Sequence, residues 1–250
     1  MEFTGIIPAR YASTRFPGKP LAMINGVSMI MRVYRQAQKA SCLSEVVVAT
    51  DDKRIFDHVN EQGGKVLMTS GKHASGTDRV YEAICTLLPD ESKWNEHTVI
   101  NIQGDEPFIE PNAIDTLSEC FKDPATGIAT LIKKISTKEE LYSPDVVKVI
   151  SGKDKQAVYF SRSPIPFIKG VDASNWMSVF SFYKHIGIYA YRADILKEIA
   201  TLGPSVLEQA EGLEQLRWLV NGYSIRIEET DYESIAVDTP ADLLKITNKA

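Results

Sequence analysis

Short apolar runs alternate with amphipathic segments through the first half of the chain. The runs are rich in β-branched residues and end in polar clusters, which is typical of strands buried in a parallel sheet. They lie at residues 3–7, 45–49, 65–69 and 98–102. The segments between them place apolar residues three and four positions apart, which predicts helices. The first of these helices is expected over 27–40, and the others begin near residues 52, 75 and 111.

Capping residues mark where several of these helices begin and end. Asp52 is placed to cap the second helix, and Gly63–Gly64 to close it. Pro111 suits the first turn of the fourth helix, because that position needs no amide hydrogen. Near the end of the chain, Thr239 followed by Pro240 predicts the start of a C-terminal helix.

Strands that alternate with helices imply right-handed crossovers and a mostly parallel sheet covered on both faces. We therefore expect a Rossmann-like α/β fold. In such sheets ligands bind beyond the carboxyl ends of the strands. Conspicuous polar clusters occupy those ends: the loop after residue 7, then Thr50–Asp52, then Gln103–Asp105.

The second half of the chain changes character and predicts an antiparallel elaboration of this sheet. Strands are expected at residues 127–135, 146–150, 156–161, 185–191, 224–228 and 234–237. The second and third of these can pair across the turn at Gly152–Asp154. Residues 206–221 have a helical apolar stripe and predict one helix. No stretch rich in Gly, Ser or Pro separates the halves, so we expect one domain over 1–250.

The composition is that of an ordinary globular protein, and 250 residues are enough for a sizeable core. The formal net charge is -5, with both signs mixed along the chain, so nucleic acid is a poor partner.

Cys42, Cys85 and Cys120 have no metal-type spacing, and we expect buried thiols in a reducing cytoplasm. No leader pattern opens the chain and no apolar run could span a bilayer, so we expect a cytoplasmic protein with no membrane segment.

The loop after the first strand carries three cations within ten residues, Arg10, Arg15 and Lys19. Charge-assisted hydrogen bonds to phosphate are short and strong, and an arginine fork binds two oxygens at once. Because the loop leaves the carboxyl end of a strand, the pattern favours a phosphate site over a set of solvated surface charges.

This loop is not a Walker A phosphate loop. That motif needs a glycine five residues before its Gly-Lys pair and Ser or Thr directly after the pair. Here Ser13 stands at the first glycine position, and Pro20 follows Gly18–Lys19. Backbone cradling of the kind used by P-loop kinases is therefore not expected.

Two carboxylates follow apolar runs and are candidate metal ligands. Asp105 comes directly after the fourth predicted strand, and Asp238 after the last one. Magnesium is a hard cation, usually held by one or two carboxylates together with phosphate oxygens and water. The alternative is that each aspartate caps a turn or a helix, and Asp238, which precedes Thr-Pro, is well placed to do so.

A set of motifs runs through the chain in a fixed order. They read IPARYASTRFPGKPL, VVATDD, ASGTDR, NIQGDEP, YFSRSPIPF, HIGIYAY, LEQLR and VDTPADL. Together they resemble the 3-deoxy-manno-octulosonate cytidylyltransferase family, also called CMP-Kdo synthetases, from about the third residue nearly to the end. The resemblance implies a fold of the nucleotide-diphospho-sugar transferase type. It also implies a nucleotide-binding part over roughly 1–130, with sugar-binding and dimerisation elements over roughly 131–230.

The resemblance implies a reaction as well. CTP and the eight-carbon acid sugar Kdo give CMP-Kdo and diphosphate, for lipopolysaccharide biosynthesis, with Mg²⁺ as the metal, in a cytoplasmic homodimer. The anomeric hydroxyl of the sugar attacks the α-phosphorus and diphosphate leaves in line. Such a transfer needs positioning and charge neutralisation more than covalent participation by the protein.

Site residues are implied position by position. The implied catalytic residues are Arg10, Arg15, Lys19 and Asp105. The implied nucleotide-binding residues are Arg10, Lys19, Ala74, Ser75 and Arg79. Contacts to the sugar acid are implied for Gln103, Arg162, His185, Tyr189, Glu214 and Gln215, with Arg162 suited to the carboxylate of Kdo. The implied metal ligands are Asp105 and Asp238.

Other interpretations stay open for several of these residues. His185 begins a predicted strand and could be a core histidine. Glu214 and Gln215 are adjacent on a predicted helix, where neighbouring side chains point about 100° apart, so a solvated face is the alternative. The aromatic stretch 176–183 could form a lid, a dimer contact or part of the core.

Two competing functions differ in what they require. A synthetase for 8-amino-Kdo, a sialic acid or another acid sugar, or one using another base, would share the cationic loop and the carboxylates. It would differ around Arg162 and Glu214. A non-catalytic nucleotide-sugar binder would lack one of the metal carboxylates or loop cations, and none is missing here.

Overall fold

A computed structural model describes residues 1–12 and 15–247 of the chain. Within these residues, nine strands form one sheet, in the order β11-β7-β10-β6-β1-β4-β5, with β8 and β9 attached as a hairpin beside β10. The strands are β1 (Glu2–Ala9), β4 (Glu45–Thr50), β5 (Val66–Met68), β6 (His97–Asn101), β7 (Ile128–Lys134), β8 (Lys148–Ser151), β9 (Ala157–Ser161), β10 (Tyr183–Arg192) and β11 (Ile225–Glu229). A separate short hairpin joins β2 (Met23–Ile24) to β3 (Val27–Ser28).

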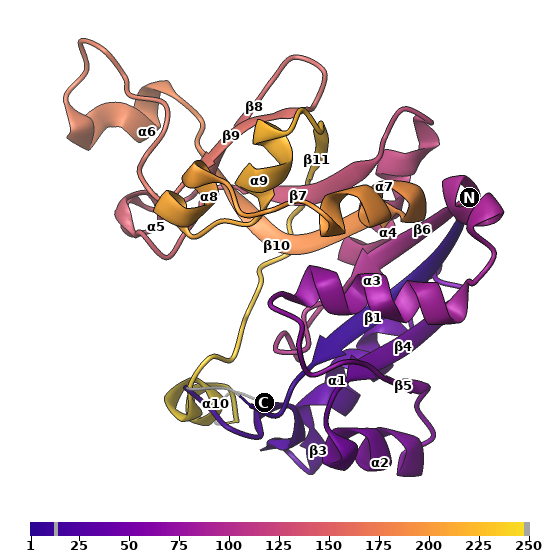
Figure 1. The fold of residues 1–250 in the computed structure, drawn as a ribbon. Coiled ribbons are helices and arrows are strands. Elements are labelled where there is room, and N and C mark those ends of the chain that lie inside the picture. Colours follow the sequence, from indigo (N-terminus) through magenta and orange to yellow (C-terminus); the bar gives the residue numbers. More distant parts are fainter. Residues whose placement is uncertain (13–14, 248–250) are drawn as a thin grey trace.

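The direction of the strands matches the predicted fold class. β1 pairs in parallel with β4 and β6, β4 with β5, and β7 with β11. β10 runs antiparallel to β6, β7 and β8, and β8 is antiparallel to β9. The protein is therefore a mixed α/β protein whose parallel sheet continues into an antiparallel part in the second half, as the sequence predicts (Figure 1).

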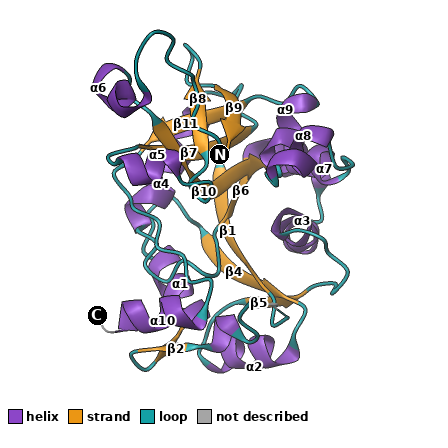
Figure 2. Cartoon of the chain, turned by 90° about the vertical axis from the view of Figure 1, so that its left-hand side faces the viewer, coloured by secondary structure: helices purple, strands orange, loops and turns teal. Residues whose placement is uncertain are grey.

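Helices cover both faces of the sheet, as Figure 2 shows. They are α1 (Met29–Ala37), α2 (Lys53–Glu61), α3 (Gly76–Leu87), α4 (Pro111–Glu119), α5 (Lys138–Tyr142), α6 (Trp176–Val179), α7 (Ala193–Ala200), α8 (Val206–Glu211), α9 (Gln215–Val220) and α10 (Pro240–Thr247). One apolar cluster joins α1, α2 and α4 to the sheet, and a second joins α3, α7 and α9 to its other face. Each face of the sheet therefore has its own apolar core, which is covered by helices.

The predicted caps are confirmed where the local sequence determines them. Asp52 accepts a hydrogen bond from the Arg54 amide, at the start of α2. Thr239 Oγ1 accepts one from the Asp242 amide at 3.2 Å, and α10 begins at the next residue. Gly63 adopts a φ of 75° just past α2, a left-handed conformation that costs other residues more.

Three predicted elements differ from the structure. The first helix begins at Met29, not at residue 27, because Val27–Ser28 pairs with β2. The helix predicted over 206–221 is two helices, since Gly212 ends α8 with a φ of 63° and turns the chain before α9. Residues 234–237 form no strand, and their contacts come from side chains and from one backbone hydrogen bond to Asp105.

The cysteines are free thiols, and burial raises the pKa of Cys42 to about 12 and of Cys120 to about 11. Cys120 is buried as predicted, whereas Cys42 and Cys85 are only partly buried. Among the described residues, no helix combines the length and apolar character needed to cross a bilayer.

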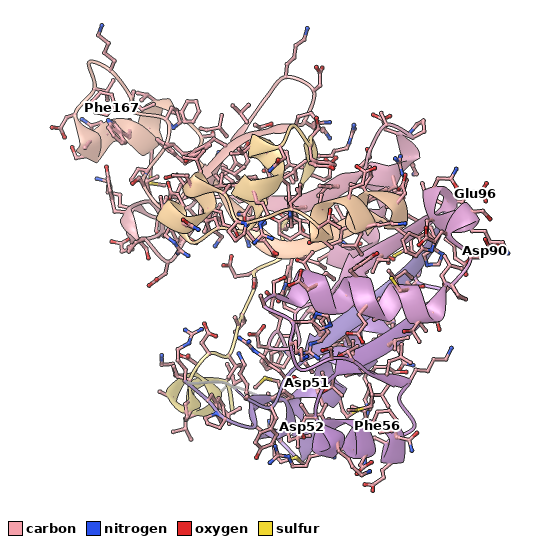
Figure 3. All side chains as sticks on the ribbon, viewed as in Figure 1. Asp51, Asp52, Phe56, Asp90, Glu96 and Phe167 are labelled. Atoms are coloured by element: carbon pink, nitrogen blue, oxygen red, sulfur yellow. The ribbon has the colours of Figure 1, made fainter. Side chains whose placement is uncertain are left out.

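The aromatic stretch lies on an arm that extends from the sheet beside β8 and β9 (Figure 1). Trp176 and Phe182 are buried together with Ile135 and Leu141 in a small cluster of their own. Phe167, labelled at the outer end of the arm in Figure 3, is 75% exposed. The stretch is therefore partly the core of this arm.

Candidate functional site

A polar cavity of about 310 Å³ opens at the carboxyl edge of the parallel strands. Its walls come from the segments that follow β1, β5 and β6, together with Asp238, which precedes α10. The lining residues are Pro8, Ala9, Arg10, Arg15, Lys19, Pro20, His73, Ala74, Ser75, Gly76, Arg79, Gln103, Gly104, Asp105 and Asp238. All five residues predicted to bind nucleotide are among them, as are both predicted metal ligands and Gln103.

Lys19 is the centre of the charged groups in this cavity. Its ammonium lies 2.6 Å from Asp105 Oδ2 and 3.4 Å from Asp238 Oδ1. Arg15 Nη2 lies 3.1 Å from the same oxygen of Asp238. Two carboxylates from distant parts of the chain therefore meet cations of the opening loop at one place.

The backbone explains how Lys19 reaches this position. Gly18 has a φ of 73°, and its amide donates to the carbonyl of Tyr11 at 3.0 Å, which closes the cationic loop on itself. A short 3-10 turn, Lys19–Leu21, then points the Lys19 side chain back toward the sheet edge. Arg10, at the start of the loop, also lines the cavity and is exposed.

The carboxylates suit a hard divalent cation. Oxygen ligands from one or two acidic side chains, completed by phosphate and water, are the usual magnesium environment in nucleotide enzymes. No group of three or more His, Cys, Asp or Glu side chains gathers at a metal site in the described part of the chain. A cation between Asp105 and Asp238 would thus need further oxygens from a bound phosphate chain.

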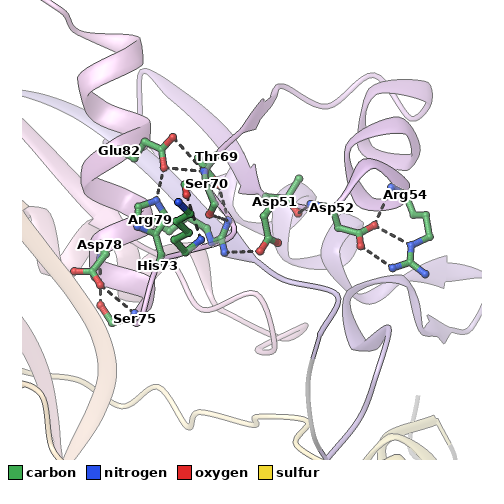
Figure 4. A network of polar contacts seen from close by, with 12 residues as sticks. Asp51, Asp52, Arg54, Thr69, Ser70, His73, Ser75, Asp78, Arg79 and Glu82 are labelled. Carbon is green, nitrogen blue, oxygen red and sulfur yellow. Dashed lines mark hydrogen bonds and ion pairs between the residues drawn. The ribbon is translucent and has the colours of Figure 1, made fainter.

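The loop before α3 also lines the cavity, and Figure 4 shows its polar contacts. Ser75 and Asp78 make a reciprocal capping box that fixes the first turn of the helix. Arg79 is 4% exposed and bonds the carboxylate of Asp51 at 3.1 Å and Thr69 Oγ1 at 2.5 Å. Its guanidinium thus ties the end of β4 to α3, while part of the side chain still borders the cavity.

His73 lines the cavity and was not predicted from the sequence. Its ring bonds the carboxylate of Glu82, which also accepts the amide of Ser70 (Figure 4). These contacts hold the loop that carries Ala74 and Ser75. The only signal in the sequence was its position directly before the ASGTDR motif.

The residues predicted to contact a sugar form a second group beside the cavity. Gln103 belongs to both, since it lines the cavity and donates to the carbonyl of Gly187 on β10 at 3.0 Å. On either side of Gly187, the rings of His185 and Tyr189 have centroids 5.2 Å apart. Thr130 Oγ1 and His185 Nε2 are 3.0 Å apart. Burial lowers the pKa of His185 to about 3, so this ring is neutral at ordinary pH.

Glu214 reaches the cavity region from the N-terminal end of α9. Its carboxylate accepts a hydrogen bond of 2.8 Å from Thr77 Oγ1, in the first turn of α3. Burial raises the pKa of Glu214, against the effect of that hydrogen bond. The adjacent Gln215 is 5% exposed, so the solvated-face alternative does not hold for it.

Arg162 bonds two backbone carbonyls in the second half of the chain. Its Nε donates to the carbonyl of Glu211 at 2.7 Å, and its Nη1 to the carbonyl of Pro144 at 2.9 Å. Arg162 does not line the cavity, and neither do His185, Tyr189, Glu214 and Gln215. The structure therefore joins the residues predicted to bind nucleotide and metal in one cavity, and of the predicted sugar residues only Gln103 lines it.

Comparison with known proteins places this arrangement in a class. The cationic loop follows the first strand of a mostly parallel sheet and faces Asp105, after β6, and Asp238, just before α10. This arrangement fits a nucleotidyltransferase, and the comparisons show that class. The chain belongs to the cytidylyltransferase family, which matches residues 4–229, and within it to the 3-deoxy-manno-octulosonate cytidylyltransferases.

The relatives cover nearly the whole chain. The 3-deoxy-manno-octulosonate cytidylyltransferase of Parabacteroides distasonis is 53% identical over 98% of this chain and 96% of its own length. That of Thermodesulfovibrio yellowstonii is 48% identical, over 95% and 94%.

Solved structures agree with this placement. A structure of CMP:2-keto-3-deoxy-manno-octonic acid synthetase complexed with CTP superposes with a TM-score of 0.90 at 42% identity, covering 100% of this chain and 98% of the other. The 4-diphosphocytidyl-2C-methyl-D-erythritol synthase of Anaerococcus prevotii shares the fold, with a TM-score of 0.63 at 12% identity over 99% and 98% of the two chains.

Proposed function

We propose that this chain transfers the CMP group of CTP to the anomeric hydroxyl of Kdo, giving CMP-Kdo and diphosphate for lipopolysaccharide biosynthesis. The observation that carries the proposal is the meeting of Lys19 with Asp105 and Asp238 in a cavity that also holds Arg10 and Arg15. Full-length similarity to 3-deoxy-manno-octulosonate cytidylyltransferases supports the choice of nucleotide and sugar.

The loop cations act on the triphosphate. Arg10, Arg15 and Lys19 line one wall of the cavity and carry fixed positive charge. They bind the phosphate oxygens and stabilise the charge that develops on the departing diphosphate. Donors placed in advance around a developing charge contribute most when they do not reorganise during the reaction.

Asp105 and Asp238 would hold the divalent cation, which we propose to be Mg²⁺. When bound, Mg²⁺ neutralises phosphate charge and polarises the α-phosphoryl group. Because Lys19 contacts both carboxylates, the arriving triphosphate gives its ammonium new anionic partners. The carboxylates are then available to the cation.

The sugar acid would lie beyond Gln103, between β10 and α9. Gln103, His185, Tyr189, Glu214 and Gln215 offer hydroxyl-binding groups, and Arg162 the cation for the sugar carboxylate. The contact from Gln103 to Gly187 and that from Thr77 to Glu214 connect this region to the nucleotide cavity. Both reactants would then be held within one continuous polar site, with Ala74, Ser75 and Arg79 at the nucleotide.

Diphosphate release tests the proposal, measured with Mg²⁺ over a panel of CTP, UTP, ATP and GTP against Kdo, 8-amino-Kdo and a sialic acid. We expect release from CTP with Kdo. Release only with 8-amino-Kdo or a sialic acid would replace the proposed sugar. Release only with another nucleotide would replace CTP. Tight binding of CMP-Kdo with no release from any pair would identify a non-catalytic binder.

We propose that the enzyme works in the cytoplasm as a homodimer. Support for the dimer comes from the apolar side chains that the arm leaves exposed: Phe167, Val179 and Phe180 are 75%, 58% and 41% exposed. Sedimentation velocity should give about twice the mass of one chain. Phe167→Ser should shift that equilibrium toward the monomer.

A further inference from the structure

An irregular segment, residues 230–238, connects β11 to α10 and is here called the strap. It runs from the end of β11 to the start of α10 as an extended stretch without helix or strand (Figure 1). Its first residue donates its amide to the carbonyl of Ile132 at 2.9 Å. Its last residue is Asp238, whose carboxylate meets Lys19 and Arg15 in the cavity. The position of this carboxylate therefore depends on what holds the strap.

On its outer side the strap is held by Lys133 and Lys184, which pair with Glu233. On its inner side it is held by one buried carboxylate, that of Glu106. This residue is 5% exposed. Its Oε2 accepts a hydrogen bond of 2.9 Å from the Tyr232 hydroxyl, and its Oε1 accepts one of 2.7 Å from the Ser234 hydroxyl. Each oxygen thus binds a different residue of the strap. Burying a carboxylate is costly unless its oxygens are paired, and here the strap supplies the partners.

Glu106 is also the neighbour of Asp105 in sequence. The Asp105 side chain points to Lys19, while its carbonyl accepts the amide of Val237 at 2.9 Å. Val237 is fully buried with Ile24 and Met29. Two successive residues after β6 therefore hold the strap at three points just before Asp238. The spacing of Asp105 and Asp238 is determined by the same short segment of backbone.

A simple role in stability explains these contacts poorly. Tyr232 is 3% exposed and already packs in the main apolar cluster, so an apolar residue at position 106 could hold its ring. A buried ionisable group often adds less stability than well-packed apolar atoms would. What the Glu106 carboxylate adds is a defined position for the strap. Each of its two oxygens accepts a hydrogen bond from a different residue of the strap, which holds the strap in one place relative to the end of β6.

We propose that Glu106 is a positioning residue for the metal site. By binding the hydroxyls of Tyr232 and Ser234, it holds Asp238 opposite Asp105 and so sets the affinity for a divalent cation bound with the nucleotide. This inference rests on the proposed function, because it takes these two aspartates as the metal ligands. Residues that orient metal ligands typically change metal affinity by about 10- to 100-fold when they are altered.

The test uses the double variant Tyr232→Phe/Ser234→Ala, which removes both donors and keeps the tyrosine ring. Glu106→Gln is the second variant. Tyr34→Phe is the matched control, since Tyr34 is 4% exposed and accepts the amide of Lys65 far from the cavity. CTP binding to the full chain is measured by calorimetry with and without Mn²⁺, in the absence of acid sugar. Hydrogen exchange is followed in the strap.

We expect Mn²⁺ to strengthen CTP binding in the parent chain and in Tyr34→Phe. In the double variant this gain should fall about tenfold, while CTP binding without metal changes less than twofold. Amide exchange should become faster in the strap and not in β1. Raising Mg²⁺ should restore turnover in the double variant. With Asp238→Asn as background, removing the two hydroxyls should cause no further loss, because their effect passes through Asp238.

Three results would overturn the inference. One is an unchanged gain from Mn²⁺ in the double variant and in Glu106→Gln. Another is a loss of CTP binding that is equal with and without metal, which would mean a general structural role. The third is an additive loss in the Asp238→Asn background. Failure of the proposed function is distinct, since the parent chain itself would then release no diphosphate from any nucleotide and sugar pair.

Discussion

The ammonium of Lys19 lies between two carboxylates, 2.6 Å from Asp105 and 3.4 Å from Asp238. It therefore occupies the region where the proposed cation would bind. If the proposed function holds, Lys19 is both a phosphate ligand and a competitor for the proposed metal site.

Lys19→Met should separate these two effects. Turnover should fall by about a hundredfold or more, because a charged donor to the triphosphate is lost. Binding of Mn²⁺ without nucleotide should instead become stronger, because the competing ammonium is gone and both carboxylates stay. Initial rates and paramagnetic resonance titration measure the two. Lys72→Met, at an exposed lysine of the neighbouring loop, is the control. Weaker Mn²⁺ binding in Lys19→Met would contradict the competition.

Arg79 should matter for stability as well as for the nucleotide. Its buried guanidinium pairs with Asp51 and bonds Thr69. Arg79→Met should lower the free energy of unfolding by about 2–4 kcal/mol, because it leaves the carboxylate unpaired. Arg79→Lys should recover only part of this free energy of unfolding, since an ammonium cannot reproduce the guanidinium fork. Urea unfolding followed by circular dichroism measures both. A loss below about 1 kcal/mol in Arg79→Met would limit Arg79 to a role in binding.

Gly212 should be sensitive to substitution because of its backbone conformation alone. A Cβ there would meet nothing closer than 3.8 Å, but its φ is 63°. Gly212→Ala should therefore cost about 1 kcal/mol of unfolding free energy. It should also raise the KM for the sugar, because Glu214 follows two residues later. Gly203→Ala is the matched control, at an open position with no positive φ. Equal costs for the two would rule out the conformational explanation.

The half-buried ring of His185 should make stability depend on pH. Burial lowers its pKa in the folded state to about 3, below the ordinary value of 6.5. Between these values the unfolded chain binds a proton that the folded chain does not, so stability falls as pH drops from about 6.5 toward 3. His185→Gln should flatten this dependence. Between pH 7 and pH 4.5 the variant should lose about 1–3 kcal/mol less unfolding free energy than the parent chain does. Urea unfolding at pH 7, 5.5 and 4.5 gives the difference. Parallel curves for both proteins would contradict the assignment.

Features set by local sequence were predictable. The strands of the first half, the cap at Asp52 and the start of α10 depend on residues within a few positions of one another. The meeting of the cationic loop with Asp105 was also predictable. The carboxyl ends of parallel strands share one edge, so residues far apart in sequence come together there.

Features that depend on backbone conformation or on contacts between distant parts of the chain could not be predicted from the sequence. The apolar stripe over 206–221 continues through Gly212, and only the left-handed φ of that residue shows the break. The alternating residues 234–237 looked like a strand, yet this stretch forms no strand and is held by Glu106 and Asp105. Glu106 stands next to Asp105 in the motif, but its partner Tyr232 lies 126 positions away. One sequence contains no signal for that contact.

The central claim is that Asp105 holds a divalent cation at the triphosphate. The most direct test is magnesium-dependent diphosphate release from CTP and Kdo by the parent chain, by Asp105→Asn and by Asp145→Asn, an exposed control. Asp105→Asn removes a ligand charge and little volume, so its unfolding curve and CTP binding without metal should match those of the parent. Its turnover should fall at least about a thousandfold, while Asp145→Asn stays near normal. Near-normal magnesium-dependent release by Asp105→Asn would contradict the account.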